Sequence, residues 1–161
     1  MGTDSRRKRE NGAKTRHRHF INAFGENLIV EHIETAVARA ADRAGVVVGE
    51  FTAAPVYPAG DRPAGLELAV EIEGAAWADP SRQRSFTEAF DQSLKAQNVD
   101  YTTKRGDDLG MAPPTITALS PGVFHRWLDS RGKLGGQHKC PRCANNREIL
   151  DAVVGVGRSG G

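Results

Sequence analysis

The order in which helical and strand-like patterns follow one another from His19 onward decides the fold class of this sequence. Apolar residues first recur at three- and four-residue spacing, as on one face of a helix: Leu28, Ile29, Ile33, Ala36, Val37, Ala40 and Ala44. Gly45 follows where a left-handed C-terminal cap is expected. Residues 46–51 and 66–72 have the composition of two short strands, and the proline- and glycine-rich stretch 54–65 predicts a loop between them.

A second helix is marked by Asp79, which can cap its N-terminus, and by Pro80 at its first position. One face of this helix carries apolar residues at four-residue intervals: Phe86, Phe90 and Leu94. The stretch 98–106, which contains Tyr101, is predicted to be an irregular connection. It leads to a third strand over 114–119.

Two helices are predicted near the C-terminus. Ser120 and Pro121 repeat the signal of a capping residue followed by proline, and the short helix they begin should end at Gly132. The last helix is expected to start near Asn145, whose side chain would form a capping box with Glu148.

Strands and helices therefore interleave without the regular strand–helix–strand rhythm of a doubly wound sheet. We predict an α+β domain, a small two-layer sandwich of about three or four strands with helices packed on the sheet. This domain is expected to span residues 16–154. It would follow a disordered basic tail over 1–15 and precede a flexible terminus over 155–161.

Length and charge exclude several classes of protein. The chain has 161 residues, which is enough for one domain, and its 22 basic and 20 acidic residues give a net charge of +2. This balance is not that of a strongly basic nucleic-acid binder. No apolar stretch reaches the roughly 18 residues of a membrane span, and no secretory signal is present, so we expect a cytoplasmic protein without membrane contact.

The basic residues gather at the N-terminus. Residues 1–18 hold seven of them: Arg6, Arg7, Lys8, Arg9, Lys14, Arg16 and Arg18. Such a run can dock on nucleic acid or an anionic surface. We favour the simpler interpretation of a solvated tail, so nucleic acid is not expected as a partner.

The most unusual segment is the stretch 132–148, which combines glycines with Lys133, His138, Lys139 and Arg142 ahead of a predicted helix. Glycines allow backbone N–H groups to approach a ligand closely, and a helix N-terminus favours anions. These residues would therefore suit a phosphate or a carboxylate. The composition is equally typical of an ordinary glycine-rich turn with solvated charges, and both interpretations stay open.

Cys140 and Cys143 form a CxxC pair within this segment. A structural zinc site needs four ligands, and a second pair at suitable spacing is absent from the sequence. A thioredoxin-like redox pair would need a preceding strand and a helix that opens at the first cysteine. We therefore interpret the two thiols as incidental and expect no metal site.

Two longer stretches carry a family resemblance. RHFINAFGENLIVEHIETAV (18–37) and the run 98–142, which ends in GKLGGQHKCPR, resemble the small C-terminal domain of bacterial members of the auxin-responsive Gretchen Hagen family. The resemblance covers roughly residues 16–151, and the glycine-rich block at its end is the most specific part. These proteins are acyl-acid amido synthetases related to the adenylate-forming ligases.

The resemblance implies a ligase that works in two steps. ATP and a carboxylic acid would give an acyl-adenylate, and an amino acid would then attack it to form an amide. The small domain would close over the site as a lid and bring in a lysine, which corresponds to Lys139 as the catalytic residue. Gln137 and Arg142 would support it on the nucleotide side.

The same resemblance implies that acyl acid, amino acid and ATP with Mg are engaged only together with a large adenylation domain, in the same or another chain. This chain alone is then expected to be inactive and without a cofactor, as a gene fragment or a detached domain. The alternative is a stand-alone binding or interaction module that holds an anionic ligand or a partner protein.

Overall fold

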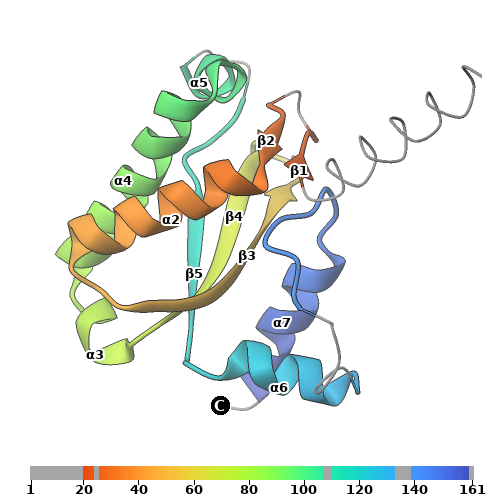
Figure 1. Ribbon diagram of the computed structural model, residues 1–161. Coiled ribbons are helices and arrows are strands. Elements are labelled where there is room, and N and C mark those ends of the chain that lie inside the picture. The colour runs from red at the N-terminus through yellow and green to blue at the C-terminus, as the bar shows by residue number, and fades with distance from the viewer. Residues whose placement is uncertain (1–19, 24–25, 107–109, 133–138, 160–161) are drawn as a thin grey trace, which may run out of the picture.

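The computed structural model describes residues 20–23, 26–106, 110–132 and 139–159. The chain trace in Figure 1 shows the order of the elements. They are β1 (Phe20–Ile21), β2 (Leu28–Ile29), α2 (Val30–Ala44), β3 (Val48–Val56), β4 (Gly65–Ile72), α3 (Gly74–Trp77), α4 (Pro80–Gln97), α5 (Val99–Gly106), β5 (Thr115–Leu119), α6 (Val123–Ser130) and α7 (Glu148–Ser159).

The central sheet has the strand order β3-β4-β5. Strands β3 and β4 pair antiparallel, and β4 and β5 pair parallel, so the sheet is mixed. The three strands predicted from the sequence are all present, and the predicted α+β class is confirmed.

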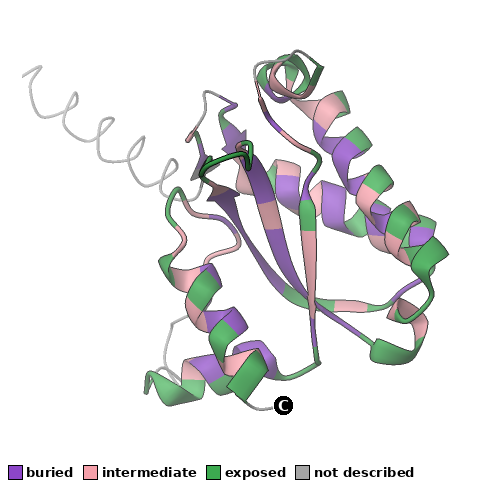
Figure 2. Cartoon of the chain, turned by 180° about the vertical axis from the view of Figure 1, so that it is seen from behind, coloured by how far each residue is buried: buried purple, intermediate pink, exposed green. Residues whose placement is uncertain are grey.

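The side chains of β4 alternate between the two faces of the sheet. Leu68 and Val70 lie in the larger hydrophobic core with residues of α2 and α4, and Ala69 lies in a smaller core with residues of α6 and α7. Figure 1 and Figure 2 show α2 and α4 on one side of the sheet and α6 and α7 on the other. The sheet with α2 and α4 is the expected sandwich, and the two C-terminal helices add cover on the opposite face.

Several helix ends follow the sequence signals. Asp79 accepts a hydrogen bond from the backbone N–H of Ser81 at 2.9 Å, and Pro80 is the first residue of α4. Gly45 ends α2 with a φ of 68°, in the left-handed region that glycine adopts without strain. The first helix begins at Val30 rather than at Leu28, because Leu28 and Ile29 pair with β1.

The structure corrects the predictions for two segments between α2 and β5. Strand β3 continues to Val56 into the predicted loop, since Pro55 and Val56 stay in register with the start of β4. Residues 99–106 form helix α5 instead of an irregular connection. The side chain of Asn98 accepts a hydrogen bond from the N–H of Tyr101 at 2.8 Å and so supports the first turn of α5.

The last helix also differs from its prediction. It begins at Glu148, whose N–H donates to the side chain of Asn146 at 3.0 Å, so the capping residue is not Asn145. The terminus expected to be flexible from residue 155 is helical up to Ser159, and Val156 within it packs against the smaller core. The tail predicted over 1–15 lies outside the described residues.

Within the described ranges, none of the helices combines the length and the apolar character needed to cross a bilayer.

Candidate functional site

The end of the glycine-rich block runs along the free edge of β3. The N–H of Ala53 donates to the carbonyl of Arg142 at 2.9 Å, and the N–H of Ala144 donates to the carbonyl of Ala53 at 3.1 Å. Thr52, which is buried, donates from its hydroxyl to the carbonyl of Pro141 at 2.6 Å. Residues 140–144, called the edge segment below, therefore extend the sheet by one short parallel bridge.

Arg142 ties this edge segment to the rest of the site. Its guanidinium donates a hydrogen bond to Glu34 on α2 and lies 3.6 Å from a carboxylate oxygen of Glu50 on β3. The same group lies over the ring of Phe51, with its central carbon 4.9 Å from the ring centroid. We call Arg142 together with Glu34, Glu50 and Phe51 the arginine clamp.

A cavity of about 630 Å³ opens beside the clamp, at the edge of the sheet. It is lined from four elements, by Val30, Glu34, Glu50, Phe124, His125, Leu128 and residues 139–142. The wall from α6 is largely apolar, with Phe124 and Leu128 beside His125, whereas α2 contributes one apolar residue, Val30, and the carboxylate of Glu34. Lys139 is exposed at this cavity, and no carboxylate of the described residues lies within ion-pair distance of it.

Two of the three residues predicted for the site thus meet at one cavity. Lys139 offers an available cation, whereas the charge of Arg142 is shared with two carboxylates. Gln137 lies outside the described residues. The sequence analysis missed Glu34 and Glu50, because a carboxylate on an amphipathic helix or in a strand carries no signal of a partner far away in sequence.

The two cysteines lie in different cores. Cys143 packs with α2 and α4, and Cys140 packs with α6 and α7, so the CxxC pair is divided between the two faces of the sheet. Both thiols are free, and burial raises the pKa of each to about 12. The described residues hold no group of three or more His, Cys, Asp or Glu side chains placed to bind a metal ion.

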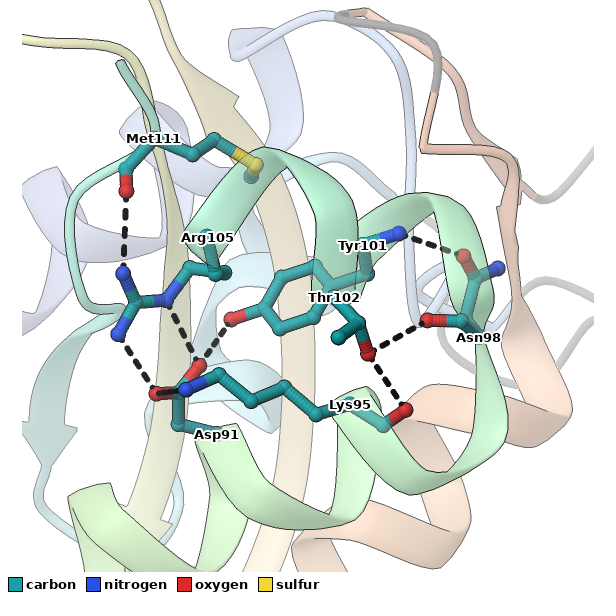
Figure 3. A network of polar contacts seen from close by, with 7 residues as sticks. All are labelled: Asp91, Lys95, Asn98, Tyr101, Thr102, Arg105 and Met111. Atoms are coloured by element: carbon teal, nitrogen blue, oxygen red, sulfur yellow. Dashed lines mark hydrogen bonds and ion pairs between the residues drawn. The ribbon is translucent and has the colours of Figure 1, made fainter. Parts of the chain in front are cut away.

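A second polar cluster, shown in Figure 3, joins α4 to α5. Asp91 accepts hydrogen bonds from Tyr101 and Arg105, and Lys95 lies 3.5 Å from the same carboxylate. Arg105 also donates to the carbonyl of Met111 at 3.1 Å. None of these five residues lines the cavity, and their polar atoms satisfy one another, so the cluster has a structural role.

Comparisons with known proteins agree with this fold. A family model described as the GH3 family C-terminal domain matches residues 31–148. Two similar solved structures are a GH3.15 acyl acid amido synthetase (TM-score 0.67, 18% identity) and an AtGH3.15 acyl acid amido synthetase in complex with 2,4-DB (TM-score 0.68, 17% identity). No curated protein matches the chain.

The two structural matches differ greatly from this chain in length. Each match covers 86% of this chain and 26% of the solved one, so the chain spans about a quarter of the length of these relatives. At 17–18% identity the likeness shows a shared fold.

Proposed function

Because the chain belongs to the GH3 family, whose C-terminal domain matches residues 31–148, we propose that it is the lid domain of an ATP-dependent acyl acid amido synthetase. The whole enzyme would activate a carboxylic acid as its acyl-adenylate and release pyrophosphate. An amino acid would then attack the carbonyl carbon to form the amide, with AMP leaving. A large adenylation domain, in the same or another chain, would hold the acyl acid and most of the nucleotide, in the cytoplasm.

The observation that carries this proposal is the position of Lys139. Its ammonium group has no ion-pair partner among the described residues and borders a cavity whose wall from α6 is largely apolar. Lys139 is exposed in this chain; once the large domain covers the cavity and excludes water, a cation there would stabilise negative charge more strongly than it does in water. Lys139 would place its charge against the phosphate oxygens, where charge develops as the adenylate forms or breaks down.

The described residues fit ATP with Mg only in part. Lys139 is one cation for a phosphate, while Glu34 and Glu50 carry negative charge in the same cavity and are partly offset by Arg142. When bound, the nucleotide would supply the adenylyl group that activates the acid. Gln137 remains proposed as a residue on the nucleotide side and Arg142 as a residue that supports Lys139, and most of the nucleotide site would belong to the large domain.

The proposal is tested by measuring two reactions, ATP–pyrophosphate exchange and amide formation. We expect neither from the purified 161-residue chain. Both should occur once a GH3 large domain from the same genome is fused to it or supplied separately. Robust exchange by the chain alone, with any carboxylic acid, would contradict the proposal. A combined protein that formed no amide would instead favour a binding module.

A further inference from the structure

Three kinds of contact converge on the edge segment, directly after Lys139. The backbone of Ala53 pairs with residues 142 and 144, the Thr52 hydroxyl binds the Pro141 carbonyl, and Arg142 reaches both Glu34 and Glu50. Of these three contacts only the ion pair with Glu34 reaches α2, and the buried side chains of Cys140 and Cys143 add apolar contacts to the two cores. The contacts differ in chemistry, yet all of them fix the same few residues.

The guanidinium of Arg142 is already engaged on three sides. One terminal nitrogen bonds Glu34, the other faces Glu50 at 3.6 Å, and the planar group covers the ring of Phe51. An anionic ligand would have to displace these partners to bind Arg142. Lys139 needs no such exchange, because it has no carboxylate partner among the described residues.

We propose that Arg142 is a positioning residue: through the arginine clamp it holds the edge segment on β3 and so fixes the point from which Lys139 reaches the cavity. This inference rests on the proposed function, in which Lys139 places its charge against the phosphate oxygens of the nucleotide. Backbone hydrogen bonds at the edge of a sheet can open locally, so the clamp adds to the hold that the Thr52 hydroxyl and the buried Cys140 and Cys143 side chains give the segment. A displacement of a reacting group by about 1 Å can cost about a hundredfold in rate, so a fixed starting point for Lys139 matters.

The clamp is tested on the full 161-residue chain by nuclear magnetic resonance, without any measurement of activity. In the Arg142→Ala variant, we expect hydrogen exchange at the amides of Ala53 and Ala144 to become about five to ten times faster, which is the size expected for losing a partly exposed ion-pair network. The backbone order parameters of Lys139 and Cys140 should fall toward about 0.6. The amide of Leu68, in the centre of the sheet, should exchange as before.

Two matched variants keep the test decisive. Arg39→Ala removes a different arginine, which is exposed and lies on α2. It should leave hydrogen exchange at the amides of Ala53 and Ala144 unchanged. The double variant Glu34→Gln with Glu50→Gln keeps the stacking of Arg142 and removes both ion pairs, so it should loosen the edge segment in the same direction. If Arg142→Ala does not fold, the double variant alone tests whether the arginine clamp holds the edge segment. Unchanged exchange and order in the double variant would overturn the proposal.

A kinetic measurement separates positioning from direct nucleotide binding. In a protein that also contains the large domain, Arg142→Ala should lower kcat by about tenfold or more and leave the KM for ATP nearly unchanged. A raised KM for ATP with unchanged amide exchange would contradict the proposal. Failure of the proposed function would be seen elsewhere, as normal turnover of Lys139→Ala, while the exchange results on the clamp would stand.

Discussion

The hydroxyl of Tyr101 donates a hydrogen bond to Asp91 Oδ1 at 2.6 Å, at the point where α4 and α5 meet. Arg105 donates to both oxygens of the same carboxylate, at 2.9 and 2.7 Å (Figure 3). Tyr101 is fully buried and Asp91 nearly so. Each hydrogen bond to this carboxylate therefore replaces water that cannot reach it, which makes the cluster sensitive to small changes.

Removing the Tyr101 hydroxyl should destabilise the protein. Tyr101→Phe keeps the ring in the core and leaves Asp91 with one hydrogen bond fewer, at an expected cost of about 1–2 kcal/mol in the free energy of unfolding. Urea denaturation measures this change. The control is Tyr57→Phe: Tyr57 is 45% exposed and its hydroxyl donates to the carbonyl of Asn145, so its loss should cost less than about 0.5 kcal/mol. Equal losses in the two variants would contradict the prediction.

Because of the Asp91 carboxylate, we predict that the free energy of unfolding decreases in acid. Burial by itself would raise the pKa of Asp91, but hydrogen bonds from Arg105 and Tyr101 outweigh burial and hold this pKa below its ordinary value. Asp91 thus stabilises the folded protein at pH values above the unfolded pKa of about 3.9, and this contribution is lost as the pH falls through the lower folded pKa.

The test compares the free energy of unfolding of the protein and of Asp91→Asn between pH 7 and pH 3. At neutral pH the variant should be less stable, because Arg105 loses its charged partner. The difference between the two proteins should shrink below about pH 4. Two parallel pH profiles would show that Asp91 does not contribute in this way.

The two thiols should be unreactive in the folded protein. Burial raises the pKa of both Cys140 and Cys143 to about 12, so little thiolate is present at pH 8. We expect slow alkylation by iodoacetamide in buffer and rapid alkylation in urea. Because the thiols lie in two different cores, no stoichiometric zinc is expected either. Metal analysis that found about one zinc per chain, lost in Cys140→Ser, would refute this.

Two glycines of α7 should respond differently to alanine. A Cβ added at Gly155 would meet nothing within 4 Å, so Gly155→Ala should stabilise the helix by about 0.5–1 kcal/mol. At Gly157 the added Cβ would lie 3.2 Å from Leu119 Cδ2, and this crowding should cancel part or all of the gain. Thermal denaturation of both variants measures the difference. A larger gain at Gly157 than at Gly155 would contradict the predicted packing.

Replacing Lys139 tests the proposed chemistry. In a protein that contains the large domain, Lys139→Ala should slow amide formation by about 10²–10³, as expected when one preorganised charge is removed from a reacting centre. Because Lys139 is exposed, the free energy of unfolding should change by no more than about 0.5 kcal/mol. Lys133→Ala is the control and should retain most of the activity. Normal turnover of Lys139→Ala in both steps would contradict the proposed role and indicate that Lys139 is an ordinary solvated lysine.

The sequence by itself determined the order of the main elements and the α+β class. Asp79 with Pro80 marked the start of α4, Gly45 marked the end of α2, and the apolar face of α2 was visible from Ile33 to Ala44. These signals are local: a cap and a helical face are made by residues only a few positions apart, so the sequence pattern contains them completely.

Tertiary structure alone decided how the site is assembled. Glu34 and Arg142 lie 108 positions apart, and they meet only because the edge segment pairs with β3 beside α2. The extension of β3 through Pro55 and the stabilisation of α5 by the Asp91–Tyr101 contact likewise depend on partners from other elements. The local sequence around these residues does not indicate the contacts that they make. Proline and glycine favour loops, and isolated carboxylates favour water. Their states were fixed by the free energy of contacts between distant segments, which no local pattern records.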